Sequence, residues 1–148
     1  MYYVNKEQIA VRLNSIPDIA SALEQLSANW QGSLLEGLAQ ERALHLAIET
    51  VTDVGSYLID GFILRDASSY EDIVEIAGEA EAFPSSIQPL LIELVKLRKP
   101  LVQEYYGWQR SELHSMTRDL PDQLRLFGES VKQYLARELP DESDLRKS

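Results

Sequence analysis

Apolar residues recur at helical spacing along almost the whole chain, beginning near the N-terminus. From position 9 to position 26 they lie three or four apart, as on one face of a helix: Ile9, Leu13, Ile16, Ile19, Leu23 and Leu26. Asn5, with Gln8 three residues later, has the pattern of a capping box and is expected to begin this helix. Because proline removes a backbone hydrogen bond, we expect Pro17 to kink or split it.

A second periodic run is longer and clearer. It follows a turn at residues 30–33, and its pattern predicts a helix from about Leu38 to Ile63. Its inward positions are Leu44, Ala47, Ile48, Val51, Val54, Gly55 and Leu58. Gly61 is expected in the last turn, where a glycine lowers helix stability.

A short acidic helix is expected next, and two serines can begin it. Ser68 with Glu71, or Ser69 with Asp72, has the spacing of a capping box. The apolar positions of this helix are Ile73, Val74, Ile76 and Ala77.

After a break at residues 84–86, an apolar run from Ile87 to Leu97 predicts a further helix. Beyond this helix, Pro100 disfavours helical backbone at Lys99. The last helix is expected to begin at Pro121 and to continue through Leu124, Phe127, Val131, Tyr134 and Leu135.

The chain has neither an alternating strand pattern nor a repeat of fixed period. The sequence therefore predicts an all-α bundle of about five helices with short connections and antiparallel neighbours. We expect a single domain over residues 1–139 and a polar tail over residues 140–148.

Composition restricts the classes of protein further. The chain has 148 residues, of which 45% are apolar and 26% charged, as is typical of one globular domain. It contains no cysteine, which excludes disulfides and cysteine-based zinc sites. We see neither a signal peptide nor an apolar run long enough to span a bilayer, so we expect a cytoplasmic protein with no membrane partner.

Charge is distributed unevenly. The net charge of −10 argues against broad binding to nucleic acid, because phosphates would be repelled. Residues 96–110 nevertheless contain four cations and one anion, a local charge of +3. This basic segment also contains Tyr105, Tyr106 and Trp108. It is therefore either the wall of a site or a helix end with solvated cations.

Few residues offer familiar catalytic chemistry. The chain lacks a glycine-rich phosphate loop and a zinc-protease motif, and we expect no cofactor. Its only histidines are His45 and His114, so catalysis by an imidazole would have to use one of them. We interpret His114 as a surface or helix-start residue. Glu41, His45, Glu49 and Asp53, spaced four apart, could ligate a metal, but the Glu-x-x-His of di-iron bundles is missing. A polar helix flank is the simpler interpretation, and a metal-binding bundle stays as a further alternative.

Arg98 is followed after four residues by Gln103 and, two further on, by Tyr105. This spacing resembles the motif of the HEPN superfamily of helical ribonucleases, in which His stands at the place of Gln103 and Asn commonly follows the Arg. ERALHLAIETVTDVGSYLI (residues 41–59) and SSYEDIVEIAGE (residues 68–79) resemble the second and third helices of the HepT-like branch. The resemblance covers about residues 38–135.

The resemblance implies a symmetric homodimer whose two motifs face each other across a cleft, and cleavage of RNA without a metal. Arg98 would hold the scissile phosphate, Lys99 would add a second charge, and Tyr105 would be the tyrosine that a partner can modify with AMP. Tyr106 and Arg110 are further candidates for substrate binding. Many such proteins are the toxins of type VII toxin–antitoxin pairs, in which the antitoxin is a minimal nucleotidyltransferase.

Gln103 departs from the motif, as does Lys99. A carboxamide can donate and accept hydrogen bonds, but it does not titrate near neutral pH and cannot act as a general base. Two functions therefore stay open: a ribonuclease weakened at Gln103, or a catalytically silent module that binds a nucleotide, an RNA or a protein partner.

Overall fold

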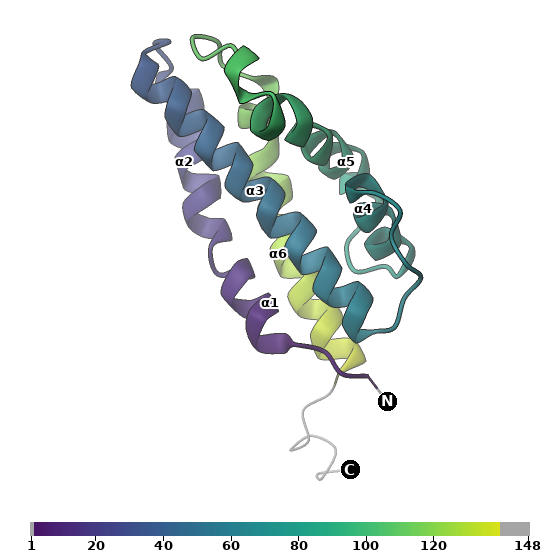
Figure 1. The fold of residues 1–148 in the computed structure, drawn as a ribbon. Coiled ribbons are helices and arrows are strands. Elements are labelled where there is room, and N and C mark those ends of the chain that lie inside the picture. The colour runs from purple at the N-terminus through teal and green to yellow at the C-terminus, as the bar shows by residue number, and fades with distance from the viewer. Residues whose placement is uncertain (1, 140–148) are drawn as a thin grey trace.

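The computed structural model describes residues 2–139, and within them the protein is all-α, as predicted. Its α-helices are α1 (Lys6–Leu13), α2 (Ile16–Asn29), α3 (Leu34–Gly61), α4 (Tyr70–Glu79), α5 (Gln88–Lys96) and α6 (Ser115–Glu138). Figure 1 shows α3 running the length of the bundle, with α1 and α2 on one side, α4 and α5 on the other, and α6 packed behind. The tail expected at residues 140–148 lies outside the described residues.

The first predicted helix is split, as its proline suggested. The side chain of Asn5 accepts a hydrogen bond from the Gln8 backbone N–H at 3.2 Å and begins α1. The chain breaks after Leu13, and Pro17 lies in the first turn of α2. Proline is well tolerated there, because the first N–H groups of a helix have no partner within the helix.

The long helix α3 begins four residues earlier than the apolar pattern predicted. Ser33 and Glu36 form a reciprocal capping box, which fixes the start at Leu34. At its other end Gly61 is the last helical residue, and a Cβ there would lie 2.8 Å from Cγ2 of Val4. This glycine therefore lets the N-terminal segment pass close to the helix.

Most of α3 is buried, because helices cover it on two sides. From residue 42 onward only a narrow stripe of its side chains reaches solvent: Arg42, His45, Leu46, Glu49, Asp53, Ser56, Tyr57 and Asp60. The stripe includes three of the four residues considered above as metal ligands. Their spacing of four is thus the spacing of the exposed side of a core helix.

Helix α4 begins at the second of the two proposed caps. The Oγ of Ser69 accepts a hydrogen bond from the backbone N–H of Asp72 at 3.0 Å. Arg65 donates two hydrogen bonds to the Asp72 carboxylate, at 2.9 and 2.8 Å, and these hold the pKa of Asp72 well below its usual range. This arrangement fixes the start of α4 and with it the position of Tyr70.

The expected start of the last helix was wrong, and so was the expected backbone at Lys99. Helix α6 begins at Ser115, with His114 as its N-cap, so Pro121 lies inside the helix. Helix α5 ends at Lys96, close to the predicted end at Leu97. Helical backbone was not expected at Lys99, yet the chain continues there as a π-helical turn over Lys99–Gln103, in which the Glu104 N–H donates to the Lys99 carbonyl at 2.8 Å. Since Pro100 has no N–H to donate, a widened turn accommodates it without a break in the coil.

Within residues 2–139, none of the helices is both long enough and apolar enough to cross a membrane.

Candidate functional site

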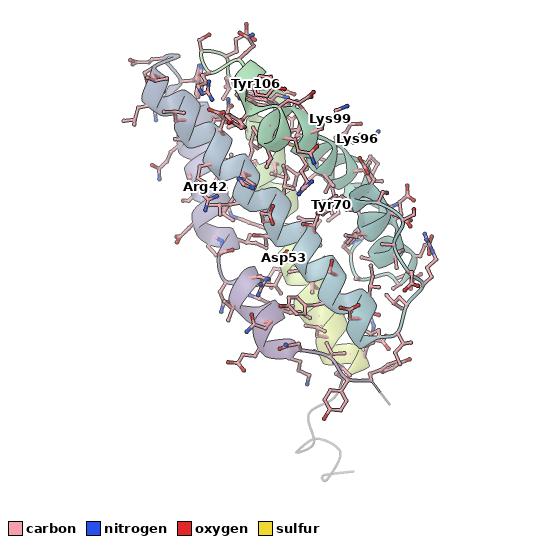
Figure 2. The ribbon with its side chains drawn as sticks, viewed as in Figure 1. Arg42, Asp53, Tyr70, Lys96, Lys99 and Tyr106 are labelled. Carbon is pink, nitrogen blue, oxygen red and sulfur yellow. The ribbon has the colours of Figure 1, made fainter. Side chains whose placement is uncertain are left out.

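Four of the residues predicted from the motif, Lys99, Gln103, Tyr105 and Tyr106, lie on one irregular segment after α5, which we call the motif segment. It consists of the π-helical turn η2 (Lys99–Gln103) and a short 3-10 turn η3 (Tyr105–Gly107). Figure 2 shows Lys96, Lys99 and Tyr106 following one another toward the end of the bundle where α2 and α3 join. The structure therefore brings the predicted residues together, on a kind of turn that is frequent at functional sites.

Arg98 lies just before the π-helical turn and is half-buried. Its guanidinium carbon is 4.1 Å from the centroid of the Tyr70 ring, which comes from the first turn of α4. Within residues 2–139 Arg98, like Lys96 and Lys99, forms no ion pair with a carboxylate. The ring orients the cation without neutralising it, so its charge is available to an anion.

Gln103 and Tyr105 are both exposed. The Gln103 side chain makes no hydrogen bond to another residue of the described range, so it is not a buried structural amide. Tyr105 and Tyr106 pack edge to face with ring centroids 5.7 Å apart, and they are 58% and 76% exposed. These amide, hydroxyl and aromatic groups are accessible to a ligand beside Arg98.

Arg110 has a different environment from the other cations. Its Nε donates to the Glu41 carboxylate at 2.8 Å, and Nη2 reaches the Tyr105 carbonyl at 3.4 Å. The side chain of Glu41 is only 13% exposed, so this ion pair is partly desolvated. Arg110 thereby ties the segment to α3, and its charge is already compensated.

The possible metal ligands on α3 are dispersed among ion pairs. Glu41 binds Arg110, Asp53 binds Arg12 at 3.0 Å, and His45 lies 3.3 Å from Glu49. Among residues 2–139 no group of three or more histidine or carboxylate side chains is close enough to hold a metal ion. The structure thus gives the metal-binding alternative no ligand set.

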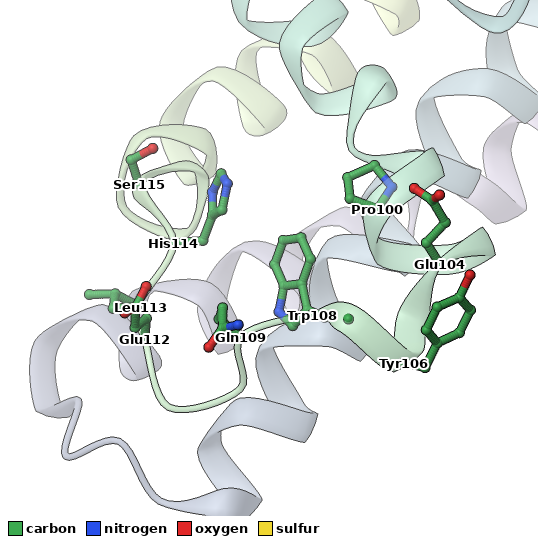
Figure 3. Close-up of a pocket in the computed structure, with 10 residues that line it drawn as sticks. Pro100, Glu104, Tyr106, Trp108, Gln109, Glu112, Leu113, His114 and Ser115 are labelled. Atoms are coloured by element: carbon green, nitrogen blue, oxygen red, sulfur yellow. The ribbon is translucent and has the colours of Figure 1, made fainter.

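A pocket of about 580 Å³ adjoins the motif segment (Figure 3). Pro100, Glu104 and Tyr106 line it on one side, and Trp108, Gln109 and His114 are among the residues that line the rest. The rings of Trp108 and His114 stack with centroids 5.4 Å apart and an angle of 22° between their planes. The pocket therefore has aromatic walls and polar groups along its rim.

One hydrogen bond selects a tautomer of the His114 ring in this pocket. Its Nδ1 accepts a hydrogen bond from the Met116 backbone N–H at 3.0 Å, so the ring proton must be on Nε2. Burial lowers the pKa of His114, which favours the neutral imidazole. The expectation of a helix-start residue is confirmed, and the structure adds that the ring lines a pocket.

A buried amide fixes the position of this pocket wall. Gln40 on α3 is fully buried; its Nε2 donates to the Glu112 carbonyl at 3.0 Å. Its Oε1 accepts from the His114 N–H at 2.9 Å and from Oγ1 of Thr117 at 2.7 Å. Gly37, one turn earlier, allows the Arg110 backbone to approach α3, since a Cβ there would lie 2.2 Å from the Arg110 carbonyl oxygen.

Sequence reasoning missed Tyr70, which stacks on Arg98, and the stacking of Trp108 on His114. Tyr70 follows the serine that caps its helix, but nothing in the local sequence links it to Arg98. The stacked pair could have been suspected, because Trp108 lies in the basic segment and His114 shortly after it.

Comparisons with known proteins give a family, a relative and a similar solved structure. The family described as ribonuclease HepT-like matches residues 13–131. The chain is 34% identical over 139 residues to "Putative RNase YutE" of Bacillus subtilis (strain 168), covering 94% of this chain and 95% of that protein. A solved structure of YutE, described as a cytosolic protein of unknown function, superposes with a TM-score of 0.84 at 31% identity, over 95% of this chain and 97% of the other.

Proposed function

The chain belongs to the HepT-like ribonuclease family, and from that premise we propose that it is a metal-independent endoribonuclease whose catalysis is weakened at Gln103. Arg98 holds the scissile phosphate, Gln103 contacts the ribose, and Tyr105 lies beside them. The protein acts in the cytoplasm, where a relative described as cytosolic is found.

The observation that carries this proposal is the state of Arg98. Its guanidinium is oriented by Tyr70 at 4.1 Å and has no carboxylate partner within residues 2–139, although the chain as a whole carries −10. A structural arginine in so acidic a protein would be expected to pair with a carboxylate, as Arg110 does. Arginine also matches the planar, bidentate geometry of a phosphate.

Lys96 and Lys99 extend the same cationic surface. Both are exposed, and Figure 2 shows them on one side of the molecule with Tyr106 beyond. A phosphodiester bound at Arg98 would therefore meet further positive charge along its backbone. Such contacts position a nucleic acid without selecting its sequence.

Gln103 limits the chemistry. Cleavage at a ribose needs a group that takes the proton from the 2′-hydroxyl, and a carboxamide cannot titrate to do so. General base catalysis contributes roughly a factor of 10² to 10⁴. The protein should retain the part of catalysis that comes from positioning and from phosphate charge, and lose most of this factor.

We further propose that the protein acts as a symmetric homodimer with the two motif segments facing each other, and that a minimal nucleotidyltransferase antitoxin is its partner. The exposed aromatic pair Tyr105 and Tyr106 supports an interface here, since tyrosine is enriched at interface centres. The second candidate function is a silent module that binds RNA or a protein partner through the same surface. Gln103 is the observation that favours it.

An assay of labelled RNA with the purified full chain tests this proposal. The unmodified protein should cut slowly in EDTA, and Arg98→Ala should lower the rate by at least about a hundredfold, as loss of a charged transition-state contact does. Arg118→Ala, an exposed arginine on α6, is the matched control and should leave the rate unchanged. Cleavage that is equal in the protein and in Arg98→Ala would overturn the assignment of Arg98, and RNA binding without any cleavage would favour the silent module.

A further inference from the structure

The pocket beside the motif has no role in the proposed cleavage. It shares Pro100 and Glu104 with the motif segment, so it lies directly beside Lys99 and Gln103. Adjacent nucleotides of an RNA strand are close enough that a phosphate at Arg98 would bring a neighbouring base to this opening. The pocket therefore has the location of a base subsite.

The charges of the pocket suit a base and not a phosphate. Its lining within the described residues contains the carboxylates Glu104 and Glu112 and neither lysine nor arginine. Lys96, Arg98 and Lys99, which have no carboxylate partner among the residues that the structure describes, lie outside it. An RNA strand would thus keep its backbone on the cations and turn a base toward the pocket, which is the division of contacts usual for single-stranded RNA.

Aromatic rings supply the stacking surface. The partly buried indole of Trp108, which stacks on His114, stands between Pro100 and His114 in the pocket wall (Figure 3). His114 offers a neutral Nε2–H donor, because its Nδ1 is occupied by the Met116 N–H. Gln109 adds an amide, which can both donate and accept.

We propose that this pocket binds a guanine base of the RNA next to the scissile phosphate, with Glu104 accepting hydrogen bonds from N1–H and the 2-amino group. Among the four bases, guanine has two adjacent donors on its Watson–Crick edge, and a carboxylate accepts both. Adenine, cytosine and uracil each present a ring acceptor or a carbonyl there, which a carboxylate repels. His114 and Gln109 can then donate to the acceptors N7 and O6. The proposal rests on the function proposed above, because it names a base of the same RNA.

The chain offers an internal reporter for a test. It contains two tryptophans, and Trp30 lies outside the pocket with its Nε1 hydrogen-bonded to the Ser111 carbonyl at 3.2 Å. The two indole N–H signals of the ¹⁵N-labelled protein can therefore be followed separately during titration with GMP, AMP, CMP and UMP. These nucleotides share ribose and phosphate, so a difference in affinity reports the base alone.

GMP should shift the Trp108 signal saturably, with a Kd about tenfold lower than that of UMP, as a bidentate contact gives. Glu104→Gln should bring GMP and UMP to within about a factor of two, whereas Glu93→Gln, an exposed glutamate on α5 outside the pocket, should not. Equal affinities for GMP and UMP, or a shift of Trp30 without Trp108, would overturn the proposal. Because no RNA is cut in this titration, its outcome is independent of whether Arg98 supports cleavage.

A second arm distinguishes RNA from a free nucleotide. A short oligouridine with one guanosine and 2′-O-methyl sugars, which cannot be cut at the ribose, should bind more tightly than GMP and lose that advantage in Arg98→Ala. Tighter binding of GMP than of this oligonucleotide would show that the pocket serves a free nucleotide, and would refute the base-subsite assignment.

Discussion

Replacing Gln40 by methionine should destabilise the protein by about 3 kcal/mol. The substitution keeps the length of the side chain but removes three hydrogen bonds, to Glu112, His114 and Thr117. Each such bond contributes about 1 kcal/mol net. Because the amide is fully buried, water cannot take over its hydrogen bonds after the substitution. For a domain of this length, the loss corresponds to a Tm lower by about 6–12 °C.

Urea denaturation followed by circular dichroism measures this loss, and Gln25→Met, at an exposed position of α2, is the matched control. The control should change the free energy of unfolding by less than about 0.5 kcal/mol. Gln40→Met should also speed amide hydrogen exchange at His114, whose N–H donates to Gln40. A loss below about 1 kcal/mol in Gln40→Met would mean that the pocket wall does not depend on this amide.

Three further predictions concern the site. Tyr70→Leu should weaken RNA binding a few-fold, because the stacking on Arg98 at 4.1 Å is lost, whereas Tyr70→Phe should bind RNA as the unmodified protein does. Equal binding by both variants, measured by fluorescence anisotropy, would refute the orienting role of Tyr70. Burial lowers the pKa of His114, so as pH falls below about 6.5 the unfolded chain binds a proton before the folded chain does. The free energy of unfolding, measured by urea titration, should therefore fall as pH decreases through this window. His114→Asn, which keeps an N-cap acceptor, should remove this part of the pH dependence. Light scattering at micromolar concentration should show a dimer that Tyr106→Glu weakens; a monomer would contradict the proposed interface.

The helices could be predicted because their apolar faces repeat every three or four residues, and this regularity survives in the folded bundle. Their ends could not be predicted from apolar spacing alone. The start of α3 depends on the capping pair Ser33 and Glu36, and the start of α6 depends on contacts with Gln40, which is far away in the sequence. The local preference of Pro100 predicts non-helical backbone before it, but the widened π-helical turn keeps the chain coiled there.

For the candidate site, one short motif predicts Arg98, Gln103 and Tyr105, and the structure places Gln103 and Tyr105 on adjoining turns that follow Arg98. The environment of each of these side chains could not be predicted from the sequence. Within residues 2–139, Arg98 stacks on Tyr70 without a carboxylate partner, whereas Arg110 pairs with Glu41, and other helices supply both contacts. Tertiary contacts of this kind leave no periodic signal in the sequence.

The substitution Gln103→His tests the central claim most directly. The account predicts a folded protein, with the free energy of unfolding changed by less than about 0.5 kcal/mol, because Gln103 is exposed and unbonded within the described residues. The restored imidazole should raise RNA cleavage by roughly a factor of 10² to 10⁴, with a rate that follows its titration near neutral pH.

The double variant Gln103→His with Arg98→Ala supplies the control. It should lose the added activity, because the phosphate is then neither held nor neutralised. The measurement is the cleavage rate of labelled RNA by the three proteins between pH 5 and 9, in EDTA. A large, titrating gain that depends on Arg98 is the predicted result; a folded Gln103→His protein that cuts no faster than the unmodified chain would contradict the account.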